Sequence, residues 1–262
     1  MRSRYRISVN GVQMDTLDDN LLILDIAYSA PDHQVTRNRS AGLNGVEIGS
    51  PYFEGQTVTV TFELHIYDVA KRHEALQKVN AWAQAGGTLT TNDRAGQRLY
   101  YTRCERYASI ASAKNWTDPL TVVFATTFIP YWMSNTAKAI TLSGKTPKGT
   151  LKMDGNTGDA IVSATITPES TLTKIEISTG DKNSTISKIV LADISVAQGK
   201  QLVIDYVRNR FLRIRADGKN IMAKLEPASS DLLTVPCGVN TAVNISANAK
   251  VTAEISARGR WL

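Results

Sequence analysis

The chain has 262 residues, of which 42% are hydrophobic and 21% charged. This composition supports a sizeable core and fits two ordinary domains better than one large one. No apolar run approaches the roughly 18 residues of a membrane-spanning helix, so we expect a soluble globular protein without membrane insertion. The net charge of +6 comes from 30 basic and 24 acidic residues scattered along the chain, and it predicts a solvated surface rather than nucleic-acid recognition.

The N-terminal residues 1–6 are basic, as in a signal peptide, but the following residues 7–11 end at a glycine before a long apolar segment forms. We therefore expect no export signal. Cys104 and Cys237 are the two cysteines of the chain. Two isolated cysteines are too few for a disulfide framework or a zinc site, which favours free thiols in a reducing cytoplasm.

An alternating pattern marks the first strong element, residues 57–67. Hydrophobic side chains occupy every second position from Val58 to Ile66, with polar ones between them. This period of two predicts a long, half-buried strand.

The period then changes to that of a helix over residues 68–85. Val69, Leu76, Val79 and Ala83 recur at helical spacing. Asp68 is a suitable N-cap and the glycine pair 86–87 a suitable end. Trp82 falls on the apolar side of this helix, which favours a role in the core.

Further strands are predicted in the first half at residues 88–91, 98–107 and 120–129. Residues 92–97 are rich in turn formers, and Pro130 ends the last strand because it lacks an amide hydrogen. Upstream of the long strand, Asn10-Gly11 and Asn44-Gly45 are tight-turn signals that flank a segment, residues 25–43, with little regular pattern.

From residue 134 to residue 150 the composition turns to small and polar residues, with Gly144, Pro147 and Gly149. This change predicts the boundary between two domains, 1–135 and 136–262. Short segments of strand character separated by turns follow, as is typical of a β-sandwich. They are residues 160–167, 172–178, 188–191, 201–205, 211–215, 221–225, 240–247 and 250–257.

The densest basic segment is residues 208–215. As a strand it places Phe211, Arg213 and Arg215 on one face, and Arg210, Leu212 and Ile214 on the other. We interpret it as an exposed strand kept soluble by arginines, in preference to an RNA-binding face.

No residue emerges as catalytic, cofactor-binding or metal-binding. His33, His65 and His73 lack the spacing of a metal site. Asp15, Asp18 and Asp19 lack the spacing of a calcium loop and read as a solvated loop. The chain contains none of the nucleophile, phosphate-binding or dinucleotide-binding motifs, so an enzyme is not expected.

Three tryptophans leave two interpretations open. Trp116, Trp132 and Trp261 lie near predicted strand ends and domain junctions. Aromatic side chains at such places pack either at subunit interfaces or in the core.

A series of short motifs, taken in chain order, resembles the distal tail protein family of long-tailed, non-contractile phages. The order of the motifs over nearly the whole chain carries the resemblance. The first half contributes Asn10-Gly11-Val12, Ala41-Gly42-Leu43-Asn44-Gly45, Val79-Asn80-Ala81-Trp82 with Gly86-Gly87, Tyr100-Tyr101 and Phe128-Ile129-Pro130-Tyr131-Trp132. The second half contributes residues 199–205, Asp217-Gly218, residues 235–241 and Arg258-Gly259-Arg260-Trp261-Leu262. Pro236-Cys237-Gly238, where a more regular proline-glycine turn is usual, and the basic N-terminus depart from the family pattern.

The resemblance implies a mainly β protein: an N-terminal ring-forming β domain with one helix, followed by a C-terminal galectin-like β-sandwich. It implies a structural protein of the virion tail tip, assembled in the host cytoplasm, that forms a hexameric ring joining the tail tube to the baseplate. The implied partners are the tail tube protein, the tape-measure protein, the tail-associated hub protein and, in some members, a receptor-binding protein.

An alternative function is a carbohydrate-binding module in the second domain, which would recognise glycans of the host surface. Only Tyr206, Phe211 and Trp261 supply aromatic rings in that half of the chain. This is a thin supply for stacking against sugars.

Overall fold

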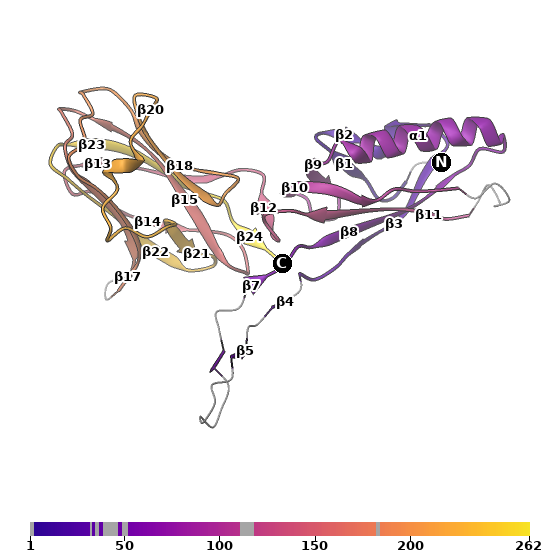
Figure 1. The fold of residues 1–262 in the computed structure, drawn as a ribbon, viewed down its shortest axis with the longest axis horizontal. Coiled ribbons are helices and arrows are strands. Elements are labelled where there is room, and N and C mark those ends of the chain that lie inside the picture. Colours follow the sequence, from indigo (N-terminus) through magenta and orange to yellow (C-terminus); the bar gives the residue numbers. More distant parts are fainter. Residues whose placement is uncertain are drawn as a thin grey trace. The chain divides into compact units, whose positions relative to one another are not determined.

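The structure is a computed structural model, and it describes residues 3–31, 33–34, 37–38, 47–48, 52–110, 118–181 and 184–262. It divides into two compact units, Met1–Trp132 with Leu262, and Met133–Trp261. Both are built mainly from antiparallel strands, which confirms the predicted fold class of a mainly β protein with a single α-helix in its first half (Figure 1). In the described part of the chain, no helix is long and apolar enough to cross a membrane.

The first unit is one sheet with a helix packed on it. Its strands follow the spatial order β2-β1-β9-β10-β11-β8-β3, and neighbouring strands in this order pair antiparallel. These strands are β1 (Ile7–Val9), β2 (Val12–Gln13), β3 (Leu21–Tyr28), β8 (Thr57–Leu64), β9 (Gly87–Thr91), β10 (Gln97–Arg106) and β11 (Leu120–Thr126). A short 3-10 helix, η1 (Met14–Thr16), links β2 to β3. Two two-stranded ribbons are formed by β4 (His33–Gln34) with β7 (Tyr52–Phe53), and by β5 (Arg37–Asn38) with β6 (Glu47–Ile48).

Strand β8 confirms the alternation read from the sequence. Val58, Val60, Phe62 and Leu64 are at most 1% exposed, whereas the residues between them are half-buried. The observed strand is shorter than the predicted one, since it ends at Leu64 and not at Tyr67.

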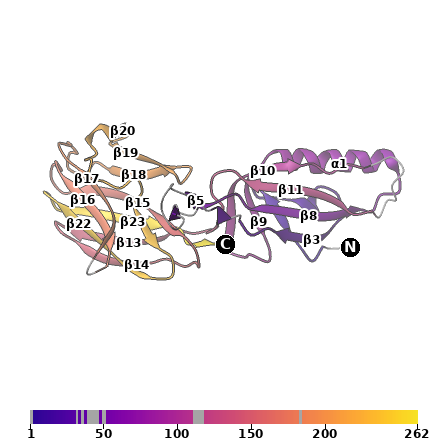
Figure 2. The same ribbon diagram turned by 60° about the horizontal axis from the view of Figure 1, so that its bottom comes forward.

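Helix α1 (Val69–Gln84) lies along one side of this sheet (Figure 2). The Asp68 carboxylate accepts a hydrogen bond from the backbone N–H of Lys71, so Asp68 is the predicted N-cap. Leu76, Val79 and Ala83 are buried as expected. Val69, the first residue of the helix, is 47% exposed, so it does not share the buried face with the other residues of the predicted pattern.

Strand β3 was not recognised in the sequence because it contains a β-bulge. The register of β3 on β8 shifts between Ile23 and Asp25, so the buried positions are Leu21, Ile23 and Ile26. One extra residue breaks the period of two, which is why the segment beginning at residue 25 reads as irregular in the sequence. The predicted turn at Asn44-Gly45 lies outside the described residues.

The second unit is a sandwich of two sheets. One sheet has the order β13-β23-β15-β18-β19-β20, with β21 paired to β15, and the other has the order β14-β22-β16-β17. Its strands are β13 (Lys138–Gly144), β14 (Lys148–Lys152), β15 (Asp159–Pro168), β16 (Ile175–Gly180), β17 (Thr185–Leu191), β18 (Leu202–Val207), β19 (Phe211–Ala216), β20 (Lys219–Asn220), β21 (Thr234–Pro236), β22 (Asn240–Ala247) and β23 (Val251–Ala257). Buried side chains from both sheets form a single hydrophobic cluster between them. Two short strands, β12 (Trp132–Ser134) and β24 (Arg260–Trp261), lie where the chain enters and leaves this unit.

Two strands that the sequence did not predict, and one segment predicted wrongly, lie in the second half. Residues 134–150, which suggested the domain boundary, contain β13 and the start of β14. The small polar residues there belong to outward faces of strands at the sandwich surface. Residues 221–225 form the 3-10 helix η2 (Met222–Lys224) and not a strand, since the Asn220 side chain accepts a hydrogen bond from the Met222 N–H and starts a tight turn.

Candidate interaction surface

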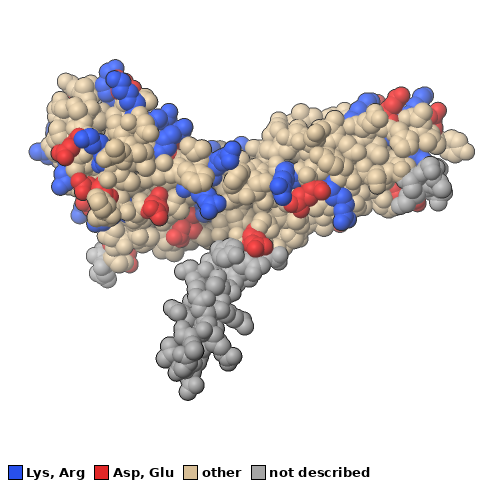
Figure 3. All heavy atoms as spheres, in the orientation of Figure 1, with Lys and Arg blue, Asp and Glu red and all other residues tan. Residues whose placement is uncertain are grey.

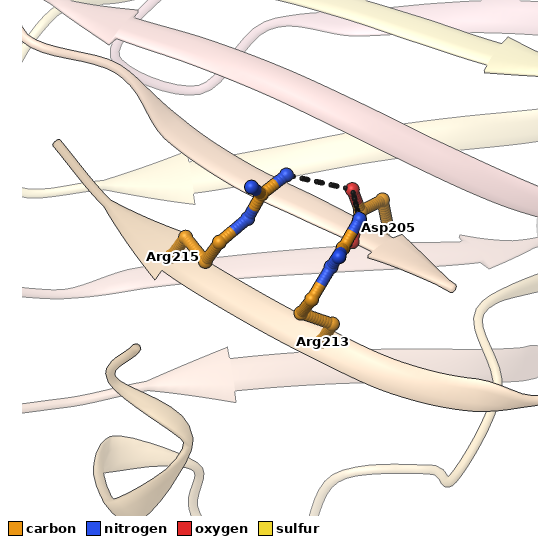
Figure 4. Close-up of polar contacts among 3 residues, drawn as sticks. All are labelled: Asp205, Arg213 and Arg215. Carbon is orange, nitrogen blue, oxygen red and sulfur yellow. Dashed lines mark hydrogen bonds and ion pairs between the residues drawn. The ribbon is translucent and has the colours of Figure 1, made fainter. Parts of the chain in front are cut away.

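An ion-pair cluster lies on the outer face of the β18–β19 hairpin (Figure 4). Asp205 of β18 stands directly opposite Arg213 of β19. Arg213 Nε lies 2.7 Å from Asp205 Oδ1, and Arg213 Nη2 lies 2.7 Å from Asp205 Oδ2. Arg215 Nη2 donates a third hydrogen bond to Asp205 Oδ2, over 3.0 Å. One carboxylate therefore holds two guanidinium groups in defined positions.

The strand period explains why these side chains point outward. Ile204 and Ile214 face the core and are fully buried, so their neighbours Asp205, Arg213 and Arg215 face the solvent. The prediction that Phe211, Arg213 and Arg215 share one face is confirmed by this pattern.

The prediction that Arg210, Leu212 and Ile214 share the opposite face of this strand is correct in part. Ile214 is buried and Leu212 is half-buried, as expected for an inner face. Arg210 belongs to the turn between β18 and β19 and not to the strand. The turn is made by Arg208 and Asn209 with left-handed backbone angles, φ 53° and 51°, which the sequence pattern does not reveal.

The electrostatics of the cluster follow from its geometry. Hydrogen bonds from Arg213, together with the charges of Arg213 and Arg215, lower the pKa of Asp205 below its ordinary value despite partial burial. The same partner raises the pKa of Arg213. Asp205 and Arg213 are thus charged at neutral pH. Groups in this state recognise charge and do not exchange protons, so the surface is suited to binding and not to acid–base chemistry.

A surface hollow of about 410 Å³ lies beside the cluster. Arg215 and Val203 form one part of its wall, and the segment around Lys200 and the turn at Asp217 form the rest. Lys200 Nζ lies 3.3 Å from Asp217 Oδ1, and both side chains are more than half exposed. The hollow is open to solvent and carries the charged side chains of Lys200, Arg215 and Asp217, so it extends the charged surface and is not an enclosed ligand cavity.

The described histidines do not share a common site. His65, just beyond the end of β8, places its Nε2 2.7 Å from Oε2 of Glu63 on that strand, and His73 is exposed on α1. The side chain of His33 lies outside the described residues. Among the residues that the structure describes, no group of three His, Cys, Asp or Glu side chains is arranged to hold a metal ion.

The acidic residues near the N-terminus form a turn. Asp18 Oδ1 accepts hydrogen bonds from both the backbone N–H and the side chain of Asn20, and Asp18 Oδ2 lies 3.9 Å from Lys78 Nζ. This carboxylate therefore organises the start of β3. Asp15 lies in η1 and is half-buried, so the predicted solvated loop is wrong at this position.

Both cysteines are unpaired thiols, each half-buried. Burial raises the pKa of Cys104 and of Cys237. Thiols with a raised pKa are mostly protonated at neutral pH and are weak nucleophiles, so neither is a candidate for covalent catalysis.

The tryptophans divide between core and surface. Trp82 is 6% exposed and its Nε1–H donates to the Val12 carbonyl over 2.8 Å, as expected for a core residue. Trp132 is fully buried and packs edge-on against Tyr28, which favours the core interpretation. Trp261 is half-buried, and Trp116 lies outside the described residues.

The sequence reading missed Asp205. The pattern that could have pointed to Asp205 is a single acidic residue inside the apolar strand β18, opposite a strand that carries two arginines. Only the register of the hairpin, set by the turn at residues 208–210, brings Asp205 opposite Arg213.

The arrangement of a one-helix β unit followed by a β-sandwich is that of phage tail baseplate proteins of known structure. The chain matches SPP1 Dit, described as a paradigm of the hub adsorption apparatus in phages that infect Gram-positive bacteria, with a TM-score of 0.72 and 14% sequence identity, over 97% of this chain and 98% of that chain. It also matches chains of the phage P2 baseplate in its activated conformation with calcium and with strontium, at TM-scores of 0.51 and 0.50 and 10% identity, over 97% of both chains in each case. No protein-family model and no curated protein matches the sequence. The resemblance to distal tail proteins read from the sequence is thus confirmed as a shared fold.

Proposed function

We propose that this chain is a structural component of a phage tail tip. The observation that carries the proposal is the match to SPP1 Dit, which extends over 97% of this chain and includes both units. A likeness limited to the sandwich would be far less specific, because β-sandwiches serve many unrelated functions. The order of short sequence motifs supports the same conclusion.

In this proposal, residues 1–135 assemble side by side into a hexameric ring that joins the tail tube to the baseplate. Residues 136–262 form a galectin-like sandwich that anchors hub or receptor-binding proteins. Tail tube and tape-measure proteins are the partners on the tube side. The protein acts in the virion after assembly in the host cytoplasm. A closed ring is the expected product of a heterologous interface whose rotation closes.

The proposal assigns no catalytic role to the chain. Asp18 organises a turn, and the pKa of both thiols is raised, which makes them weak nucleophiles. Function then resides in surfaces that bind neighbouring proteins.

The carbohydrate-binding alternative is less well supported. Tyr206 is only 9% exposed and its hydroxyl accepts a hydrogen bond from the Leu233 N–H. The ring is therefore not available to stack on a sugar. Phe211 at 55% exposed and the half-buried Trp261 are the remaining rings of this half, which is few for a sugar-stacking platform.

The first experiment is to measure the mass of the purified full chain by light scattering over a concentration series, alone and with a tail tube protein. A particle of six times the 28.6 kDa chain mass would support the ring. A monomer under all of these conditions would contradict it. Binding of the full chain to a glycan array, in the absence of any larger particle, would favour the alternative.

A further inference from the structure

The net charge of the chain is concentrated in one short segment. Residues 200–224 contain seven Lys and Arg but only two Asp, a net charge of +5 out of the +6 of the whole chain. The expectation that the basic residues are scattered evenly along the chain is therefore wrong. The basic residues are Lys200, Arg208, Arg210, Arg213, Arg215, Lys219 and Lys224.

Most of this segment forms one edge of a sheet. Residues 202–220 contain β18, β19 and β20, and β20 is the last strand in the order of its sheet, whereas the Lys224 carbonyl of η2 accepts a hydrogen bond from the Ala192 N–H beside the end of β17. Lys219 of β20 pairs with Ala216, at the end of β19 opposite the turn at residues 208–210, and blue side chains lie there in Figure 3, where Figure 1 labels β20. Arg208, Arg210 and Arg213 lie toward the turn end of the hairpin. The hairpin thus carries an excess of basic residues at this sheet edge.

An apolar pair lies within this basic surface. Val207 and Phe211 are cross-strand partners that flank the hairpin turn, and they are 40% and 55% exposed. Arg210 lies over the Phe211 ring, at 5.7 Å from its centroid. An exposed aromatic ring among arginines is the composition found at the centre of protein interfaces, where aromatic residues and Arg contribute most of the binding energy.

The acidic residues of the segment indicate what kind of partner it fits. Asp205 stays ionised because its pKa is lowered, and it lies within the surface between two arginines. A fixed negative charge there repels a uniform polyanion such as nucleic acid, which presents phosphates at regular intervals. A folded or extended protein segment can place its carboxylates beside the arginines and its apolar side chains on Phe211.

We infer that the outer face of the β18–β19 hairpin, centred on Val207 and Phe211 and surrounded by Arg210, Arg213 and Arg215, is a docking surface for an acidic protein segment that carries an apolar anchor. The ion pairs of Asp205 hold Arg213 and Arg215 in place before binding. Less side-chain entropy is then lost when the partner docks. The inference concerns this surface alone and does not depend on ring formation.

The test is a selection from a random peptide library on the immobilised full chain, followed by affinity measurement of the enriched peptides. We expect acidic peptides that contain at least one large apolar residue. Their affinity should fall by about tenfold when the salt concentration rises from about 50 mM to about 300 mM, because screening weakens exposed charge pairs. Enriched peptides that are neutral or basic would overturn the inference.

Three variants of the full chain locate the binding. Phe211→Ala and Arg210→Glu should each lower the affinity for the enriched peptides by about tenfold, which is the effect of losing one contact at the centre of an interface. Lys148→Glu makes the same charge change at an exposed position of β14, on the other sheet, and should change affinity less than about twofold. Equal losses in Arg210→Glu and Lys148→Glu would mean attraction by net charge alone and would overturn the inference.

Two further probes distinguish other occupants. Duplex DNA and the sulfated polysaccharide heparin are each titrated against the same variants. Tighter binding of either probe than of the selected peptides, with loss in Arg210→Glu, would make the surface a polyanion site and overturn the inference. Circular dichroism of each variant confirms that the substitutions leave the fold intact.

Discussion

The side chain of Asn10 occupies the space that a side chain at position 87 would need, so glycine is the residue that fits there. Asn10 Nδ2 donates to the Gly86 carbonyl over 2.7 Å, and Asn10 Oδ1 accepts from the Thr88 N–H over 2.9 Å. A Cβ at Gly87 would lie 2.4 Å from Asn10 Oδ1. The Asn10-Gly11 turn and the Gly86-Gly87 pair, recognised separately in the sequence, are thus two halves of one contact that joins β1 to β9.

Replacement of Gly87 by alanine should therefore destabilise the protein strongly. Gly87 has φ 106° and a crowded neighbour, whereas Gly96 has φ 81° and no atom within 4 Å of a Cβ. We expect Gly96→Ala to cost about 1 kcal/mol from backbone strain alone. Gly87→Ala should cost about 3 kcal/mol, because it also displaces the Asn10 hydrogen bonds. Urea unfolding of both variants measures the difference, and equal losses would show that the Asn10 contact contributes nothing.

Trp82 should contribute through its indole N–H as well as through its size. The Nε1–H donates to the Val12 carbonyl, and the ring packs edge-on against Phe124 with centroids 5.6 Å apart. Trp82→Phe keeps an aromatic ring but leaves the carbonyl without this donor, and we expect a loss of about 2 kcal/mol. Trp82→Ala should lose about 4 kcal/mol. Thermal and urea unfolding check both values, and no loss in Trp82→Phe would contradict the role of the hydrogen bond.

A buried hydroxyl network in the second unit gives a third prediction. Thr179 is 1% exposed, and its Oγ1 donates to the Thr234 carbonyl over 2.7 Å and lies 2.8 Å from Ser187 Oγ. Thr179→Val keeps the shape but removes the donor, so the Thr234 carbonyl loses a partner at a cost of about 2 kcal/mol. Thr150→Val, at an exposed position of β14, is the matched control and should change stability by less than about 0.5 kcal/mol. A similar change in the two variants would refute the buried contribution.

The Asp205 cluster predicts how stability depends on pH. Because the folded-state pKa of Asp205 is lowered, its contribution is present above the unfolded-state pKa of about 3.9 and is lost as the pH falls through the lower folded value. Asp205→Asn should therefore be less stable than the parent chain at pH 7, by about 1 kcal/mol for a partly exposed pair. The difference should narrow below about pH 4, where the parent carboxylate takes up a proton. Unfolding free energies measured from pH 7 to pH 3 test this, and a difference independent of pH would exclude the ion pairs as its source.

Elements with a complete local signal were predicted well. The alternation of β8, the Asp68 cap and the buried positions of α1 depend on residues close together in the chain, so the sequence contains all the information needed. The same holds for β22 (Asn240–Ala247), whose bounds agree with the predicted strand. Strand β3 was not predicted because its bulge shifts the pattern, and β13 was not because its side chains face mostly outward and lack an apolar period.

The sequence by itself determined the mainly β class and the helix at residues 69–84, because these follow from local periodicity. Its motif order also indicated the distal tail fold. Only the tertiary structure decided that the Asn10 side chain packs against Gly87 and that Asp205 lies between Arg213 and Arg215 on the outer face of a hairpin. Such contacts depend on strand register and turn conformation, and a shift of one residue would move every side chain to the opposite face.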